Sequence, residues 1–159
     1  MKFILALIVC ILLILVLLVV LFGIVRTIQV QHKPQQKEFL SKSAPKKLPD
    51  GIYKGTVTGL TTTWQGKKFD AKNKAGINVF KNGGTLTEKY PFKLYTGKGV
   101  QDKNTTVLKI DYSKNKSPWW LKYILDEVVE VAPGKFLGKV HITVIPGLPF
   151  TIGYFQLER

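Results

Sequence analysis

The sequence predicts an all-β domain, an antiparallel β-barrel, preceded by a single N-terminal transmembrane helix. Two observations predict this arrangement. Phe3 to Val25 form an unbroken apolar run without charge or proline. After Asp50, short β-like segments alternate with glycine, proline and asparagine turn signals, and no long amphipathic helix follows. Many short strands without covering helices bury their apolar face best in a sheet that closes on itself.

The apolar run has the length of one membrane crossing. At ~1.5 Å of rise per residue, about 23 residues slightly exceed a hydrocarbon core of roughly 30 Å. A cleaved signal peptide would have a shorter apolar region of roughly 7 to 15 residues and a small-x-small cleavage site. The run ends instead in Phe22-Gly23-Ile24-Val25-Arg26, which favours an uncleaved anchor. Cys10, the single cysteine, is interpreted as a helix-packing thiol rather than a lipidation site.

The chain is therefore expected in a membrane as a single-pass protein, and the side of the soluble domain stays open. Arg26, Lys33, Lys37 and Lys42 follow the helix closely, and the positive-inside rule would hold the domain in the cytoplasm. The very short N-terminal tail is instead typical of segments that send their C-terminal side outward.

Three regions are predicted: a transmembrane anchor at 1–26, a polybasic flexible linker at 27–49 and a β-barrel domain at 50–159. The linker is rich in lysine and glutamine and has few apolar residues and no sustained period. Two interpretations remain. The linker lies along an anionic leaflet, where each lysine adds about 1 kcal/mol of attraction, or it is a solvated spacer.

Nine candidate strands follow from apolar alternation and from turn signals such as Asn82-Gly83-Gly84 and Pro133-Gly134. A different pattern at 117–124, with a proline followed by Trp119 and Trp120, suggests a short helix or a crossing segment that caps one barrel mouth. The tryptophan pair suits a membrane interface as well as a barrel plug. The candidate strands are 52–58, 63–70, 76–80, 85–89, 92–95, 106–112, 125–132, 136–145 and 150–157.

The charge is strongly basic, with a formal net charge of +14 carried almost entirely by lysine. Such a bias favours contact with anionic lipid headgroups. Specific recognition of phosphate or guanine depends on arginine, and only Arg26 and Arg159 are present, so no specific nucleic acid partner is expected. The lysines are interpreted as a solvated coat.

Two short motifs resemble a known family. Leu48 to Gly55, with Gly51-Ile52-Tyr53-Lys54-Gly55 at its centre, looks like the glycine-x-aromatic-x-glycine opening of lipocalin-like (calycin) domains. Trp64-Gln65-Gly66-Lys67-Lys68-Phe69 is similar to the Trp-x-Gly-Lys-x-Phe stretch of the small GxWxG-type members. The likeness spans about 20 residues, and tyrosine replaces the usual tryptophan at position 53. It implies an antiparallel barrel able to enclose an apolar ligand and transfers no catalytic residue.

In such a barrel Tyr53, Gly55 and Val57 would face inward, and Gly55 would allow a sharp strand bend. Whether the interior is solid or hollow stays open, since small barrels occur in both forms. Aromatic residues and one histidine are the candidates for contact with an apolar small-molecule ligand. They are Tyr53, Trp64, Phe80, Tyr95, Tyr112, Trp119, Trp120, His141 and Tyr154.

No residue is predicted to be catalytic, and neither a metal nor a cofactor is expected. Phosphate-binding loops, nucleophile elbows and zincin motifs do not occur in the sequence. Asp126, Glu127 and Glu130 are interpreted as exposed polar alternation on a strand. His141 alternates with apolar neighbours and is expected to face solvent or a polar lumen, as a surface or hydrogen-bonded strand histidine rather than a haem ligand or a base. The other histidine, His32, lies in the linker, so a two-histidine metal site is not expected.

Three functions follow as hypotheses. The leading one is a membrane-anchored, lipocalin-like module that binds a lipid or other apolar molecule near the bilayer. The alternative is a non-catalytic structural or interaction domain with a solid core, whose basic face contacts an anionic membrane or a partner. The third is an enzyme that uses the acidic cluster or His141. Interior volume separates the first two, because a ligand needs a cavity of roughly 300 Å³ or more.

Overall fold

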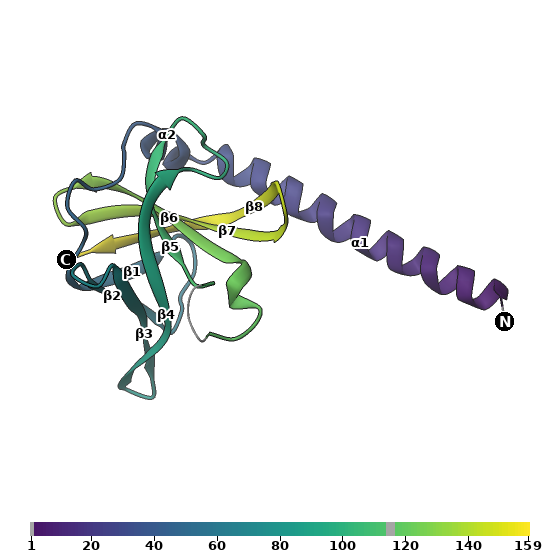
Figure 1. Ribbon diagram of the computed structural model, residues 1–159, viewed down its shortest axis with the longest axis horizontal. Helices are drawn as coiled ribbons and strands as arrows, with labels where there is room; N and C mark the ends of the chain where they lie inside the picture. Colours follow the sequence, from purple (N-terminus) through teal and green to yellow (C-terminus); the bar gives the residue numbers. More distant parts are fainter. Residues whose placement is uncertain (1, 114–116) are drawn as a thin grey trace.

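A computed structural model describes residues 2–113 and 117–159 of the chain. A long helix projects from a small β-barrel, and the two chain termini lie at opposite extremes of the molecule (Figure 1). The helices are α1 (Lys2–Gln31), α2 (Pro34–Leu40) and the 3₁₀ turn η1 (Leu121–Tyr123). The strands are β1 (Gly51–Val57), β2 (Trp64–Asp70), β3 (Ala75–Asn82), β4 (Thr85–Lys98), β5 (Thr106–Asp111), β6 (Ile124–Ala132), β7 (Lys135–Ile145) and β8 (Leu148–Glu158).

The eight strands form a closed antiparallel barrel in which each strand pairs with its neighbours in sequence and β8 closes onto β1. The predicted fold class is therefore confirmed. Along β1, Tyr53 and Gly55 are buried whereas Ile52, Lys54 and Thr56 are exposed, as period-two alternation requires.

Two of the nine predicted strands are parts of one strand. The segments 85–89 and 92–95 belong to β4, which continues through Tyr90 and Pro91 with a register shift against Ile77 and Asn78 of β3. Tyr90 has a positive φ of 61°, which is uncommon for a residue other than glycine. A β-bulge bends a strand without ending it, so the proline that looked like a strand boundary marks a bend.

The two ends of the barrel differ in what covers them. Because all neighbours are antiparallel, the connections β1–β2, β3–β4, β5–β6 and β7–β8 lie at one end, called here the mouth end. The remaining connections lie at the closed end. There the chain leading into β1 pairs with the barrel rim: the Ala44 amide donates to the Thr106 carbonyl and the Glu130 amide donates to the Ser43 carbonyl. Leu48 packs against the interior core, so this segment covers the closed end.

The structure also differs from the expected flexible linker. Residues 27–31 continue α1, and α2 follows with Pro34 at its start. Thr27, Val30 and Phe39 are buried against the outer wall of the barrel. These few residues form no periodic apolar pattern that the sequence would reveal. They are buried nevertheless, because the barrel wall supplies the surface against which they pack.

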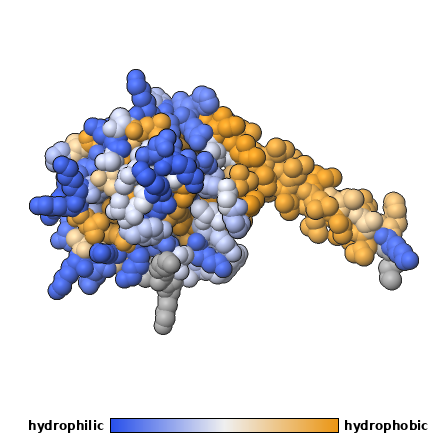
Figure 2. Space-filling view, turned by 45° about the horizontal axis from the view of Figure 1, so that its top comes forward, coloured by the Kyte–Doolittle hydropathy of each residue, from blue (hydrophilic) through white to orange (hydrophobic). Residues whose placement is uncertain are grey.

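By length and composition, α1 can cross a membrane once. Its visible surface is hydrophobic except at its free N-terminal end, whereas many hydrophilic residues cover the barrel (Figure 2). Its C-terminal half lies alongside the β7–β8 hairpin (Figure 1). Glycine at position 23 lets the Phe150 ring of β8 approach the helix backbone, because a side chain there would collide with the ring.

Two apolar clusters hold the domain together. The larger lies in the barrel interior, from the closed end to Tyr112 and Leu121 near the mouth end. It contains edge-to-face aromatic pairs, including Tyr53 with Phe69 and Tyr53 with Phe136 at centroid distances of 5.4 and 5.3 Å. The smaller lies between the outer wall and the two helices. Its buried members are Val30, Phe39, Val107, Val129, Leu137 and Tyr154.

Candidate ligand site

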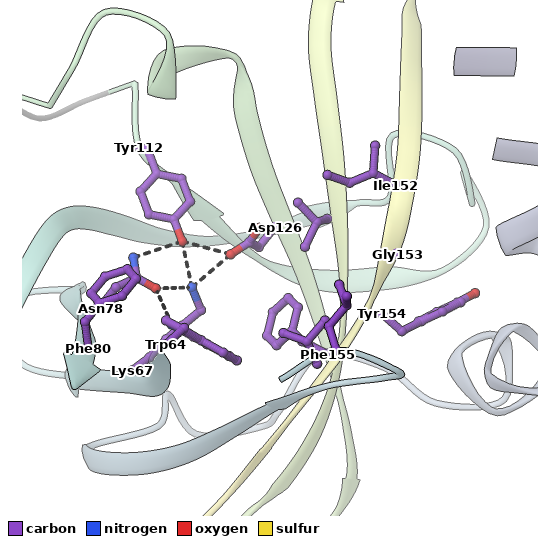
Figure 3. Close-up of a pocket in the computed structure, with 13 residues that line it drawn as sticks. Trp64, Lys67, Asn78, Phe80, Tyr112, Asp126, Ile152, Gly153, Tyr154 and Phe155 are labelled. Atoms are coloured by element: carbon purple, nitrogen blue, oxygen red, sulfur yellow. Dashed lines mark hydrogen bonds and ion pairs between the residues drawn. The ribbon is translucent and has the colours of Figure 1, made fainter. Parts of the chain in front are cut away.

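The mouth half of the barrel interior is only partly filled by side chains. A cavity of about 320 Å³ lies there, within the roughly 300 to 1,000 Å³ of small-molecule sites. Its lining comes from the ends of strands that meet at the mouth and is mostly apolar, with a few polar groups at its inner end (Figure 3). The lining residues are Val57, Leu60, Trp64, Lys67, Asn78, Phe80, Tyr112, Asp126, Val140, Ile152, Gly153, Tyr154 and Phe155.

One wall of the cavity leaves open space because Gly153 of β8 has no side chain. Gly153 pairs with Val140 of β7, which lines the same cavity. A Cβ added to Gly153 would meet no atom within 4 Å, and the backbone there has no positive φ. The space beside this glycine is therefore open, in contrast to Gly138, where the same atom would collide with the Phe155 ring.

A buried ion pair lies at the inner end of the cavity. The Lys67 ammonium of β2 lies 2.9 Å from Oδ2 of Asp126 on β6, and the two side chains are 2% and 5% exposed. The Tyr112 hydroxyl donates to the same Asp126 oxygen over 2.9 Å. These residues come from opposite walls, so the pair bridges the barrel interior.

Every hydrogen-bond donor around the lysine is paired. The Lys67 ammonium also donates to Asn78 Oδ1 at 2.9 Å and to the Tyr112 hydroxyl at 2.6 Å, which uses all three of its donors. Asn78 Oδ1 accepts a second bond from Trp64 Nε1 at 3.0 Å, and Asn78 Nδ2 donates to the Tyr90 carbonyl and the Tyr112 hydroxyl. The bulge in β4 thus places the Tyr90 carbonyl where Asn78 can donate to it.

Burial changes the acid–base properties of this cluster. Desolvation lowers the pKa of Lys67, and attraction and hydrogen bonding to Asp126 oppose that change. Desolvation raises the pKa of Tyr112 well above its ordinary value, and the Asp126 charge raises it further. The tyrosine therefore stays a neutral donor at physiological pH.

Four of the nine sequence-predicted ligand residues border the cavity: Trp64, Phe80, Tyr112 and Tyr154. The Tyr154 ring nevertheless points away from the cavity toward the helices (Figure 3), where its hydroxyl donates to Gln36 Oε1 over 2.6 Å. Trp64 and Tyr112 contribute both ring surface and a polar group to the cavity region.

The other five predicted residues lie elsewhere. Tyr53 belongs to the solid closed half of the interior, and Tyr95 is a half-exposed residue of β4. Trp119 and Trp120 precede η1 at the mouth end and are 75% and 45% exposed. The Trp120 ring packs edge-on against Tyr90, whose ring contacts Phe80 of the cavity wall at a centroid distance of 5.7 Å. His141 lies on the outer wall.

The outer wall carries a second buried polar cluster under the helices. His141 and Glu127 are fully buried, with the His141 Nε2 atom 3.3 Å from a Glu127 oxygen. Thr151 links the histidine to α1, since its hydroxyl lies 3.0 Å from His141 Nδ1 and its amide donates to the Thr27 hydroxyl. His141 therefore faces neither solvent nor the lumen, because α1 and the loop before β5 cover it.

A further ion pair in this outer cluster attaches α2 to the barrel. The Lys139 ammonium of β7 pairs with Asp102, which also accepts a hydrogen bond from Gln36 Nε2. Desolvation lowers the pKa of Lys139, and Asp102 opposes that change. In the described residues, no group of three or more histidine, cysteine, aspartate or glutamate side chains could hold a metal ion.

Two interpretations of charged residues need correction. Asp126 and Glu127 are not exposed alternation: the first is buried in the lumen and the second under the loop before β5, where the Val100 amide donates to it. The lysines are not all a solvated coat, since Lys67 and Lys139 are buried. The sequence could have indicated that Lys67 is buried, because residues 67 and 69 share a strand face and Phe69 is a clear core residue.

An apolar groove lies outside the barrel between α1 and the β7–β8 hairpin. It measures about 480 Å³ and is lined by helix residues from Leu15 to Arg26 and by hairpin residues that include Val144 and Phe150. Ile152 lines both this groove and the barrel cavity. The Arg26 guanidinium donates to the Ile152 carbonyl over 2.9 Å, at the point where the apolar part of α1 ends.

The site and fold define a closed eight-stranded antiparallel barrel with a cavity at one end, carried behind an apolar helix. No protein-family model and no curated protein matches the sequence. The chain is similar to a solved structure described as the crystal structure of a protein from Thermomonospora curvata. The two share 16% identity and a TM-score of 0.53 over 77% of this chain and 84% of that chain. At that identity the likeness shows the fold alone.

Proposed function

We propose that this chain is a membrane-anchored, lipocalin-like barrel that binds a small apolar ligand at the surface of the bilayer. The observation that carries the proposal is the cavity itself: it is mostly apolar, about 320 Å³ in volume, and lies at the mouth end of the barrel. An apolar cavity of this size is suited to an apolar ligand, whereas a purely structural barrel would be filled by its own side chains.

The position of the mouth relative to α1 supports a membrane source for the ligand. The β7–β8 hairpin lies along the apolar part of α1, and residues 142–155 contain no charged side chain. If α1 spans a bilayer, this hairpin enters the adjacent leaflet beside it. The cavity mouth then lies at the membrane surface.

The other mouth-end connections also have exposed apolar side chains. Each of the four connections has at least one exposed large apolar side chain in it or beside it, a group called here the apolar rim. The three closed-end connections, at 71–74, 99–105 and 133–134, have none in them or within two residues of them, and the structure describes all of these residues. An exposed apolar set at one end favours contact with a membrane. The apolar rim consists of Leu60, Leu86, Trp119, Trp120, Val144 and Leu148.

The alternative function is a solid-core interaction domain whose basic face contacts an anionic membrane. The closed half of the interior is indeed packed with side chains, and hydrophilic residues project from the face of the barrel that Figure 2 shows. The lysines and the apolar rim are compatible with one another, since basic residues attract anionic headgroups while apolar residues enter the interface. The cavity favours the ligand-binding function over this alternative.

The test is to identify what the cavity holds. The full chain is purified in lipid nanodiscs and the bound organic molecules are extracted and identified by mass spectrometry. Gly153→Val should remove the ligand, because its side chain occupies the open space beside Val140 without a collision.

Gly97→Val is the matched control, since a Cβ at Gly97 makes only ordinary contact with the Lys109 side chain on the outer wall. An apolar molecule enriched over bulk lipid in the parent and in Gly97→Val, but not in Gly153→Val, would support the function. Equal retention by both variants would count against it.

A further inference from the structure

The polar groups of the cavity differ in how many of their hydrogen-bonding positions are already occupied. The three donors of the Lys67 ammonium are all used, by Asn78, Tyr112 and Asp126. The Tyr112 hydroxyl donates once and accepts twice. These groups have no donor left for a ligand.

Asp126 is the exception. Its Oδ2 atom accepts from both Lys67 and Tyr112. Its Oδ1 atom makes no hydrogen bond with any residue that the structure describes, yet it is not among the fully buried unpaired atoms, so it keeps contact with the cavity space. Figure 3 shows both dashed contacts converging on one carboxylate oxygen. The free polar capacity of this cavity is therefore a carboxylate acceptor.

We infer that the cavity selects an apolar molecule that bears a hydroxyl group, which donates a hydrogen bond to Asp126 Oδ1. This inference rests on the proposed function and specifies its ligand class. A hydrogen bond to a charged acceptor in a water-poor site is stronger than one between neutral groups. The apolar lining takes the remainder of the molecule, and the carboxylate fixes its polar end at the inner end of the cavity.

The same geometry excludes other end groups. A fatty-acid carboxylate would find no donor and would approach the Asp126 charge, so it should bind poorly. An alkylammonium ion would donate to Asp126, but it would lie beside the Lys67 ammonium, which is 2.9 Å from the same carboxylate. A neutral hydroxyl avoids both repulsions.

The experiment compares decanol, its methyl ether and decanoic acid as competitors of labelled decanol. The full chain is held in lipid nanodiscs, and each concentration is expressed per mole of lipid so that partitioning into the bilayer cancels. Decanol should compete about 10- to 100-fold better than the ether, because only the alcohol donates to the carboxylate. Decanoic acid should be weaker than the alcohol.

Asp126→Asn tests whether the preference for the alcohol over the ether depends on the carboxylate. The new amide oxygen would keep accepting from Lys67 and Tyr112, and its NH₂ group would then face the cavity as a donor. The variant should lose its preference for the alcohol and bind the ether at least as well. If this variant does not fold, carbon-detected NMR of the aspartate carboxylates in the unsubstituted chain serves instead, since decanol should shift the Asp126 signal and the ether should not.

Equal competition by alcohol and ether in the unsubstituted chain would overturn the inference and leave the proposed function standing. Failure of every probe to bind, in both the unsubstituted chain and Gly97→Val, would overturn both. Loss of decanol binding in Gly153→Val would place the hydroxyl-selective site in the barrel cavity, and retention there would overturn the assignment to Asp126.

Discussion

The two halves of the barrel interior are built from the same strands but are organised differently. At the closed end, aromatic and aliphatic side chains such as Phe69, Phe136 and Leu157 pack against one another and leave only a few per cent of their surface exposed. At the mouth end, Trp64, Val57 and Val140 surround a hollow that ends at a buried ion pair. The comparison indicates that close packing is concentrated at the closed end, whereas the mouth end holds the cavity and the ion pair.

The largest effect is expected at Gly55, where β1 and β2 approach each other at the border between the two halves. A Cβ at this position would collide with the Trp64 ring and with the Gly66 backbone. Backbone cannot move aside as a side chain can, so Gly55→Val should exceed the roughly 3 kcal/mol typical of overpacking and abolish the cooperative thermal transition. Circular dichroism melting checks this, with Gly153→Val as the matched substitution at an open position. Equal melting temperatures for the two variants would contradict the difference in packing between these sites.

The next largest effect concerns the ion pair that separates the halves. Lys67→Met leaves the Asp126 charge buried without its partner and should cost about 3 to 5 kcal/mol in the free energy of unfolding. The double variant Lys67→Met, Asp126→Leu removes both charges and should recover most of that loss. Denaturant titration measures all three proteins. A double variant no more stable than the single one would mean that the pair itself, rather than the avoidance of a lone buried charge, stabilises the barrel.

Truncation of apolar residues compares the two halves directly. Leu157→Ala, in the solid half, should cost about 2 to 5 kcal/mol, because the substitution creates a cavity among close-packed neighbours. Val57→Ala, on the wall of the existing cavity, should cost about 1 kcal/mol or less, because fewer neighbours are lost. The measurement is again denaturant titration. Similar losses at the two positions would indicate that the mouth half is as tightly packed as the closed half.

Much of the fold was readable from the sequence, because strand alternation and turn residues are local signals. The faces of Tyr53, Gly55 and Val57 and the ends of most strands follow from period-two burial. The β4 bulge was missed because Pro91 looks like a terminator. The α2 segment was missed because its burial depends on one residue, Phe39, that meets a distant strand.

The candidate site was harder to predict, because its polar groups come from distant parts of the chain. Lys67 and Asp126 are 59 residues apart and meet only because the sheet closes. A lysine or an aspartate on an apolar strand face is visible in the sequence, but its partner is not. The burial of His141 likewise depends on α1 and a loop that cover the outside of the barrel, which no strand pattern reports.

The smallest effect on stability is expected at the apolar rim. Substitutions there test most directly whether the mouth of the barrel faces the bilayer. Trp119 and Trp120 are 75% and 45% exposed, so replacing both with alanine should change the free energy of unfolding by about 1 kcal/mol or less. A tryptophan buried in a core would instead cost about 3 to 5 kcal/mol. If the mouth faces the bilayer, both rings lie at the interface, where tryptophan is favoured.

Lipids brominated in their acyl chains quench nearby tryptophan, and the chain contains only one other tryptophan, Trp64. In vesicles of such lipids, the full chain should be quenched strongly, and Trp64→Phe, which keeps the exposed pair, should be quenched as strongly. The Trp119→Ala, Trp120→Ala variant should lose most of its quenching because Trp64 is partly shielded inside the barrel. Strong quenching that persists in the Trp119→Ala, Trp120→Ala variant would mean that the mouth does not face the bilayer. Weak quenching of the unsubstituted chain would mean that the apolar rim faces water or another protein surface.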